Sequence, residues 1–455
     1  METGCFASIA AYCHLSRKLW RSLCAARSFY PCLLPRGQRA YNVSMQILSS
    51  STRHQLQLPE PSADALVASQ ALQNQIHAEL ARQGGIMSFA RYMELSLYAP
   101  QLGYYSGGSQ KLGRDGDFTT APEMSPLFGA ALAHAGAPLL AQTVAQVMEF
   151  GAGTGRLAFD FLSECQQLGI TIERYFIVEL SGELRARQEL LLEPFSQVVW
   201  LTAMPQAFSG LVLGNEVLDA MPVQLLIKTE GGWRECGVAL DVADADMDVS
   251  QKESAQLILR EMPLHEQTAE SLAACIPDAN DLPTGYLTET HDVATAFMRS
   301  VSAMLLAGQA ETGGGGAAIW IDYGFPAREY YLAERAQGTL MCHYRHHAHP
   351  NPFFLPGLQD ITAHVNFTAI AQAGVDMGLS CLCYTSQAAF LLAAGIGELL
   401  LRIPNSEVMR YLPASNAVQK LISPAEMGEL FKVLVMGCGL TMPENYLTFD
   451  RSHRL

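Results

Sequence analysis

The sequence predicts an α/β fold in which helices cover both faces of a largely parallel sheet, and two observations carry this prediction. First, between residues 125 and 321, segments of helical periodicity alternate with short apolar segments that are typical of buried strands. Second, the chain has 455 residues, of which 49% are hydrophobic. That share is ample for a packed core, and it excludes a disordered or fibrous protein.

The elements of the predicted core follow one another in a regular order. Ser125 and Pro126 mark the start of a helix, because proline suits the first helical position. We expect helices at 125–140, 156–167, 182–192 and 292–309. Between them we expect strands at 146–150, 174–180, 198–201, 211–215 and 317–321, and a hairpin at 223–228 and 233–240. Alternation of this kind is typical of βαβ units.

The first 44 residues differ from the rest of the chain. They contain six Lys and Arg but a single acid, Glu2. An Arg-rich, acid-poor leader is typical of an organellar transit peptide. The alternative is an untranslated or dispensable extension ahead of a start at Met45. On either reading, residues 1–58 form a leader or dispensable extension and lie outside the predicted fold.

The remaining chain divides into three predicted regions. Residues 59–130 form an N-terminal helical cap and a long loop that we expect at the active site. Residues 131–335 form the core of the sheet, with an acidic, mostly helical or irregular insertion at about 241–290. Residues 336–455 complete the sheet and the substrate cleft, with a buried helix expected at 379–401 and a last strand pair near Val433 and Leu447.

A glycine-rich turn follows the strand at 146–150. The glycines lie at every second position, and an acid precedes them: Glu149, Gly151, Gly153 and Gly155. Glycines let the backbone turn tightly and approach a ligand closely. A dinucleotide fingerprint would require a glycine at position 156, which is Arg156. The pattern therefore favours a ligand without pyrophosphate, such as S-adenosylmethionine, whose cationic methionine end Glu149 would face. A tight turn with no ligand is the alternative.

Acidic residues also end two other expected strands. Glu179 lies at the carboxyl end of the apolar strand expected at 174–180, where a carboxylate can accept both hydroxyls of a ribose. Asn215, Glu216 and Asp219 interrupt apolar sequence after the strand at 211–215. Carboxylates there could orient a cationic acceptor and take its proton. The alternatives are a solvated charge for Glu179 and a helix cap for Asp219.

Two further segments carry polar side chains. The loop at 116–126 contributes Asp117, which we consider a candidate catalytic residue, together with Glu123. The run from Cys342 to His349 is rich in histidine, but its spacing matches no zinc module. We therefore expect no metal site and interpret the run as a loop that covers the cleft.

Several motifs together resemble the MidA family of class I S-adenosylmethionine-dependent methyltransferases, which includes the mitochondrial protein-arginine methyltransferase that assists assembly of respiratory complex I. They occur in the family's order, at residues 97–105, 116–125, 149–157, 215–222, 321–324 and 360–365. The resemblance covers roughly residues 62–450. It implies a Rossmann-like class I methyltransferase sheet with an N-terminal helical cap and insertions.

The resemblance also implies a function and its residues. The function is methyl transfer from S-adenosylmethionine to an arginine of a protein. The family's cofactor-site pattern corresponds to Glu149, Gly151, Gly153, Gly155 and Glu179. Its second motif corresponds to Asn215, Glu216 and Asp219. We expect a carboxylate pair, Glu216 with Asp219 or Asp117, to polarise the guanidinium.

Charge and composition limit the expected partners. The formal net charge of −15 argues against nucleic acid and suits a cationic protein substrate. We expect no membrane span; a respiratory complex I subunit as substrate and a homodimer are left open. The expected compartment is the bacterial cytoplasm, or the mitochondrial matrix if the leader is a transit peptide. The rival functions are an NAD-dependent oxidoreductase and a non-catalytic assembly factor on a methyltransferase fold.

Overall fold

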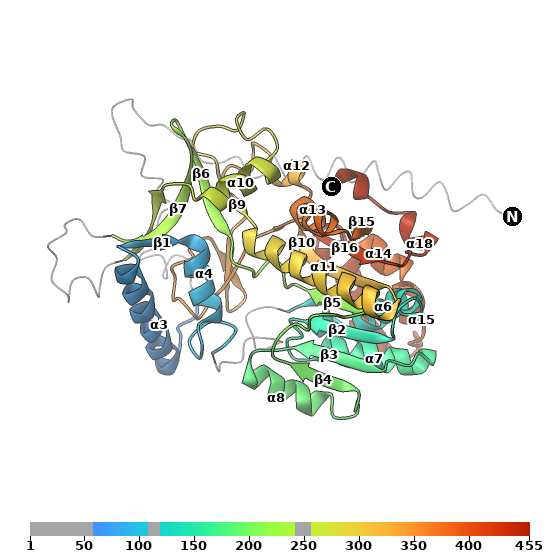
Figure 1. Cartoon of the computed structure of the whole chain (residues 1–455). Coiled ribbons are helices and arrows are strands. Elements are labelled where there is room, and N and C mark those ends of the chain that lie inside the picture. Colours follow the sequence, from blue (N-terminus) through green and yellow to red (C-terminus); the bar gives the residue numbers. More distant parts are fainter. Residues whose placement is uncertain (1–57, 108–118, 242–255) are drawn as a thin grey trace. The chain divides into compact units, whose positions relative to one another are not determined.

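The computed structural model of the protein describes residues 58–107, 119–241 and 256–455. Its main sheet has eight strands, seven of which follow one another in the order β15-β16-β10-β5-β2-β3-β4 (Figure 1). The five strands β10, β5, β2, β3 and β4 are parallel, whereas β16 is antiparallel to both of its neighbours. The α/β fold class is therefore confirmed, with a mixed sheet.

The bounds of the main strands are close to those expected from the sequence. They are β2 (Gln146–Phe150), β3 (Arg174–Val178), β4 (Val198–Leu201), β5 (Leu211–Asn215), β10 (Gly316–Phe325), β15 (Ser380–Ser386) and β16 (Phe431–Cys438). The eighth strand, β14 (Val365–Asn366), pairs with the end of β10. The chain leaves β2 toward β3 and β4 and then crosses to β5 on the other side. The strand order thus reverses at β2, and ligands of open α/β sheets bind at such a point.

Helices cover both faces of the main sheet. Successive side chains of its strands point alternately into two apolar cores, one on each face. Val147 of β2 packs with α6 (Pro126–Leu140) and α7 (Arg156–Leu168), whereas its neighbour Met148 packs with α11 (Asp292–Thr312) and α13 (Phe367–Met377). Trp320 of β10 is fully buried in the second core. A shift of one residue would turn every side chain of a strand to the opposite face, so this alternation fixes how each strand is placed against its helices.

Four strands of a second sheet lie in the chain between β5 and β10, and the fifth precedes the main sheet in sequence. The second sheet is antiparallel and has five strands: β1 (Ile86–Ser88), β7 (Gly232–Leu240), β6 (Gln224–Thr229), β9 (Leu287–Thr290) and β8 (Leu257–Met262). The expected hairpin is confirmed as β6 and β7. Helices α3 (Ala63–Arg82) and α4 (Phe89–Tyr98) share an apolar core with this sheet. Ser62 and Ser88 cap the two helices with their side chains.

Smaller elements join or flank these two sheets. A third sheet consists of β12 (His347–His349), β11 (Met341–Tyr344) and β13 (Asp360–Thr362). The other helices are α5 (Ala121–Met124), α8 (Gly182–Leu191), α10 (Glu266–Cys275), α12 (Ala327–Tyr330), α14 (Gln387–Ala393), α15 (Ile396–Leu401), α16 (Val408–Ile422), α17 (Met427–Leu430), α18 (Glu444–Leu447) and the 3-10 turn η1 (Ser452–Arg454).

Two local predictions were wrong. The apolar stretch 379–401 is strand β15 followed by α14 and α15, because its first part pairs with the edge of β16. Leu447 belongs to helix α18, so the partner of the strand around Val433 is β15. The described part of the acidic insertion is mostly helical or irregular, as expected, and it also contributes strand β8, which pairs with β7 along six residues. For residues 380–386, pairing with the edge of β16 outweighed the local propensity.

No helix within the described ranges combines the length and the apolar character that a membrane crossing requires.

Candidate functional site

The glycine-rich turn connects β2 to α7 at the carboxyl end of the sheet. Gly151, Gly153 and Gly155 have φ angles of 65°, 54° and 87°, in the left-handed region that favours glycine. A Cβ on Gly151 would lie 2.8 Å from Cγ2 of Val217, which belongs to the loop after β5. The turn therefore requires glycine for its conformation and for its close approach to the neighbouring strand end.

Glu149 lies at the base of this turn and is only 2% exposed. Its Oε2 accepts a hydrogen bond of 2.6 Å from the hydroxyl of Tyr175 on β3. Burial raises the pKa of Glu149 to about 7, and the charge of Glu179 adds to the rise, while the bond from Tyr175 opposes it. Glu149 thus ties β2 to β3 directly below the glycines.

Glu179 follows β3 and is half-buried. Its Oε1 accepts a hydrogen bond of 2.8 Å from the backbone amide of Ser181, and its Oε2 accepts one of 3.0 Å from Nε2 of Gln188. Each carboxylate oxygen has a second lone pair for a further donor. The side chain is therefore fixed in place and retains capacity for two hydroxyl groups.

Asn215 and Glu216 lie where β5 ends. Nδ2 of Asn215 donates to Oε1 of Glu216 over 3.1 Å, and the amide of Ala121 approaches the same oxygen at 3.5 Å. The backbone of Glu216 has a φ of 53°, which is uncommon for a residue with a side chain. Such strain tends to occur at functional sites. Through the amide of Ala121, the segment Ala121–Met124 contacts the end of β5.

Asp219 lies in the turn after β5 and is held there by Asp322, which is in β10. Oδ2 of Asp322 accepts hydrogen bonds from the amides of Leu218, at 2.9 Å, and of Asp219, at 3.2 Å. Asp219 and Asp322 are 5% and 1% exposed. The parallel pairing of β5 with β10 brings these two acids to the same edge of the sheet.

The acids of this edge share an electrostatic environment. Burial raises the pKa of Glu216 to about 8, with the charge of Asp219 adding to the rise, and burial also raises the pKa of Asp219 to about 6. The pKa of Asp322 lies well above its ordinary value, first through burial and then through the charges of Asp219 and Glu216. Carboxyl groups crowded in this way are stabilised by a proton or by a bound cation.

Two tyrosines and a further acid lie close to this cluster. The rings of Tyr98 and Tyr105 stack with a centroid distance of 5.5 Å. The hydroxyl of Tyr98 donates to the carbonyl of Ala220, and that of Tyr105 donates to both carboxylate oxygens of Asp360 at 2.9 and 3.0 Å. The charge of Asp360 contributes to the raised pKa of Glu216. The helical cap thus supplies an aromatic wall beside the carboxyl groups.

Two buried oxygen atoms of this edge have no hydrogen-bond partner among the described residues. They are Oδ1 of Asn215 and Oδ1 of Asp219. Since buried acceptors are normally paired, each is an open position for a donor. We call Asn215, Glu216, Asp219, Asp322 and Asp360 the acidic edge.

The remaining predictions concern the loop and the histidine-rich run. Asp117 lies outside the described residues. Glu123 belongs to α5, and its carboxylate accepts a hydrogen bond from the hydroxyl of Thr154 in the glycine turn. The run at 342–349 forms β11, β12 and the turn between them. Within the described ranges, no group of three or more His, Cys, Asp or Glu is arranged to hold a metal ion.

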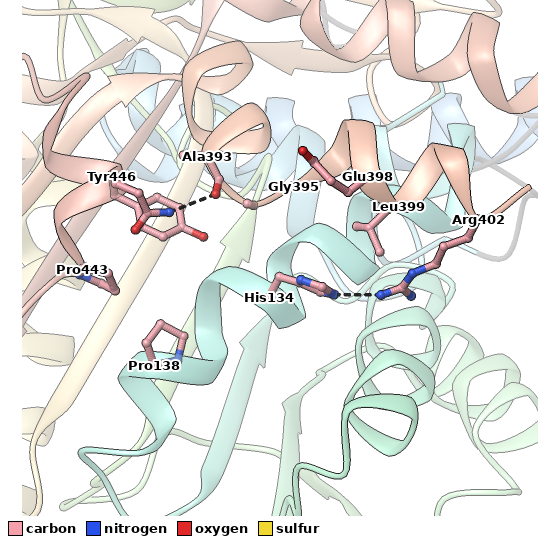
Figure 2. A pocket seen from close by; sticks show the side chains of 11 residues that line it. His134, Pro138, Ala393, Gly395, Glu398, Leu399, Arg402, Pro443 and Tyr446 are labelled. Carbon is pink, nitrogen blue, oxygen red and sulfur yellow. Dashed lines mark hydrogen bonds between the residues drawn. The ribbon is translucent and has the colours of Figure 1, made fainter.

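A pocket of about 510 Å³ lies away from the strand ends, and no predicted site residue lines it. Figure 2 shows it between α6, the α14–α15 segment and the α18 region, with His134 and Arg402 pointing toward each other. Arg402 donates to both carboxylate oxygens of the buried Glu164 at 2.8 and 3.0 Å. The guanidinium of Arg402 is therefore already paired with Glu164 and His134.

Sequence reasoning missed several residues of the site as individual candidates: Asp322, Asp360, Tyr98, Tyr105 and Gln188. Asp322 carries the same signal as Glu179, an acid within an apolar strand near its carboxyl end, and this signal could have found it. Asp360 and the tyrosines belong to segments far from the core in sequence. Only the folded chain brings them to the acidic edge.

Comparison with known proteins identifies the family of this chain. The sequence model of a family described as S-adenosyl-L-methionine-dependent methyltransferases matches residues 131–385. A protein from Drosophila melanogaster named as a mitochondrial homolog of the protein arginine methyltransferase NDUFAF7 is 29% identical over 419 residues, which cover 84% of this chain and 88% of that protein. The human NDUFAF7 is 27% identical over 395 residues, with coverages of 77% and 80%.

Two crystal structures from Burkholderia thailandensis are more similar to this chain. One, which has S-adenosyl-homocysteine bound, is 51% identical with a TM-score of 0.79. The other, a native structure, is 50% identical with a TM-score of 0.77. Each comparison covers 88% of this chain and 100% of the other. The predicted cofactor, S-adenosylmethionine, is confirmed, and the oxidoreductase alternative was wrong. The chain belongs to the MidA family of S-adenosylmethionine-dependent methyltransferases.

Proposed function

We propose that this methyltransferase transfers the methyl group to an arginine of a protein substrate, with the donor over the glycine turn and the guanidinium at the acidic edge. The observation that carries the proposal is the acidic edge itself. It combines carboxyl groups with two unpartnered buried acceptor atoms. A guanidinium has five donors and no acceptor, so it complements such a set.

The residues around the glycine turn fit S-adenosylmethionine. The left-handed glycines leave no Cβ between the backbone and a ligand. Glu179 has lone pairs left for two ribose hydroxyls. Our proposal assigns Glu149, Gly151, Gly153, Gly155 and Glu179 to the donor site. The contact of Glu149 with the methionine amino group stays a prediction, because its carboxylate is buried beneath the turn.

When bound, S-adenosylmethionine supplies a methyl group activated by its sulfonium. The chain has to hold the acceptor nitrogen in line with that methyl group, and such positioning can lower the barrier by roughly 7–11 kcal/mol. Asn215 and Asp219 offer the open acceptors that orient the guanidinium. Glu216, with its pKa near 8, is suited to receive the proton that the attacking nitrogen loses. Asp117 stays a candidate for this role.

Relatives and charge support a protein partner. The NDUFAF7 relatives are named protein arginine methyltransferases. The net charge of −15 favours a cationic partner over nucleic acid. A respiratory complex I subunit as substrate and a homodimer remain predictions.

We propose the bacterial cytoplasm as the compartment, supported by the bacterial origin of the relatives that are half identical. The mitochondrial matrix is the alternative, supported by relatives that are named mitochondrial. Residues 1–44 fused to a fluorescent protein and tested for mitochondrial import would decide between the two.

The experiment that tests the proposed function is transfer of a tritiated methyl group into a cell lysate, followed by acid hydrolysis and mass spectrometry of the labelled protein. We expect methylarginine with the unmodified enzyme, none above background with Glu216→Gln, and full labelling with Glu398→Gln, an exposed acid in the pocket of Figure 2. Label in lipid or small molecules alone would contradict the proposal. Unchanged labelling by Glu216→Gln would contradict the assigned role of Glu216.

A further inference from the structure

Gln188 lies on α8 and is completely buried, although its side chain is polar. Its amide makes three hydrogen bonds to three separate elements. Nε2 donates to the carbonyl of Gly153 over 2.8 Å and to Oε2 of Glu179 over 3.0 Å. Oε1 accepts from the indole Nε1 of Trp200 on β4 over 2.9 Å. The side chain therefore joins the glycine turn, the end of β3 and the end of β4.

The indole fixes which way this amide points. Trp200 Nε1 is a donor only, so it has to face the amide oxygen of Gln188. The NH₂ group is then directed at Gly153 and Glu179, whose oxygens are acceptors only. Arg185, also on α8, lies over the indole ring at 5.9 Å. The orientation of the Gln188 amide is thus determined by its surroundings.

The same contacts explain the third glycine of the motif. A Cβ on Gly155 would lie 3.3 Å from Cγ of Gln188 and 3.4 Å from Cδ1 of Leu192. Gly155 also has a φ of 87° at the start of α7. The glycine therefore allows α8 to approach the turn closely at the proposed donor site. Gln188 is the polar side chain of α8 at this contact.

We propose that Gln188 is a positioning residue for the donor, which sets the geometry of the glycine turn and of Glu179 together without touching the reacting atoms. Its NH₂ group donates a hydrogen bond to one lone pair of the Glu179 carboxylate and thereby directs the other lone pairs toward the ligand. It also holds the Gly153 carbonyl away from the ligand side of the turn. This inference rests on the proposed placement of the donor.

The test is calorimetric titration of S-adenosylhomocysteine into purified full-length variants. Gln188→Met preserves length and removes all three hydrogen bonds, and Gln188→Glu keeps only the acceptor for Trp200 while adding a charge beside Glu179. We expect Kd to rise roughly 10- to 100-fold for Gln188→Met, as for loss of a hydrogen bond to a charged group, and further for Gln188→Glu. Gln167→Met, at an exposed position of α7, is the matched control and should bind normally.

Stoichiometry separates positioning from mere structural support. A purely structural role would lower the fraction of binding-competent protein and leave Kd unchanged. A positioning role raises Kd at a stoichiometry near one. If Gln188→Met does not fold, Trp200→Phe removes only the indole donor and should still raise Kd several-fold, about the effect of one neutral hydrogen bond. Unchanged Kd in the folded variants would overturn the inference.

Glu179→Gln distinguishes this inference from the placement on which it rests. If Glu179→Gln weakens binding and the Gln188 variants do not, the donor site stands and the role of Gln188 is wrong. If neither substitution alters Kd, the donor lies elsewhere, and both proposals fail.

Discussion

The two halves of the strand-end edge are built in opposite ways. The half that we propose for the donor, at β2 and β3, consists of a glycine turn, the buried Glu149 beneath it, and Glu179, which Ser181 and Gln188 hold by hydrogen bonds. The acceptor half, at β5 and β10, gathers buried carboxyl groups whose pKa values are raised, such as Glu216 and Asp322. Backbone shape dominates the first half and charge dominates the second.

We infer from this difference that one half binds the methyl donor and the other half binds the acceptor. A turn without side chains can accommodate a large ligand, and its specificity comes from a small number of fixed hydrogen bonds. A crowd of buried acids is unfavourable by itself and gains stability when a cation arrives. Substitutions in one half should therefore affect one ligand and spare the other, and the predictions that follow test this separation.

The largest expected effect is on catalysis at the acceptor half. Glu216→Gln keeps the shape of the side chain but cannot receive a proton. We expect the methyl-transfer rate to fall roughly 10²- to 10⁴-fold, the usual range for loss of a general acid or base. The affinity for S-adenosylhomocysteine should stay within about twofold. A loss of donor affinity as large as the loss of rate would break the separation.

The next effect concerns the donor half. Gly151→Val places a β-branched residue at a φ of 65° and its Cβ 2.8 Å from Val217. The left-handed conformation alone costs roughly 1–2 kcal/mol, and the contact adds to this. We expect donor affinity to fall about 100-fold or more, measured by calorimetry. The exposed Gly182→Val, at a glycine with nothing nearby and an ordinary φ, is the control.

A smaller effect is expected from the proposed contact of Glu179 with the ribose. Glu179→Gln replaces one carboxylate oxygen by a donor, so one ribose hydroxyl would lose its charged partner. We expect Kd for S-adenosylhomocysteine to rise roughly tenfold. The 2′-deoxy analogue should bind the unmodified enzyme less tightly, and Glu179→Gln should discriminate between the two ligands less. Equal discrimination by both enzymes would show that Glu179 does not hold the ribose.

The smallest effect is on pH dependence. Asp219 and Glu216 have to lose protons to hold a guanidinium, and their pKa values are raised to about 6 and about 8. We therefore expect kcat/KM to increase between pH 6 and 8. Glu216→Gln should abolish the upper part of this increase. A profile that is flat in the unmodified enzyme would contradict the assignment.

The raised pKa of Glu216 also makes the stability of the fold depend on pH. The folded-state pKa of Glu216 exceeds its ordinary value of 4.5. The stabilisation from its proton is therefore fully present below 4.5 and is lost as pH rises through about 8. Thermal melts between pH 5 and 8 should show a smaller decline for Glu216→Gln than for the unmodified protein.

The donor half was largely predictable from the sequence and the acceptor half only in part. The glycine spacing and the acids Glu149 and Glu179 are local signals, because each lies within a few residues of its strand end. Asn215, Glu216 and Asp219 carry the same kind of signal. Asp360 and Tyr105 approach one another only after the helical cap and the third sheet have docked, and no local pattern encodes that contact.

The fold shows the same contrast between local and distant information. The strands of the βαβ units were found from apolar runs such as 317–321. Strand β15 was not, since its residues also fit a buried helix and only pairing with β16 decides between the two. Gln188 was missed for a related reason, because a polar residue on a short helix is normally solvent-exposed.

The most direct test of the central claim is a crystal structure of this protein with S-adenosylhomocysteine. We expect the ribose hydroxyls to lie within hydrogen-bond distance of Glu179 and the sulfur to lie between the glycine turn and the acidic edge. A ligand bound in the pocket of Figure 2, or one whose sulfur points away from Glu216, would contradict it.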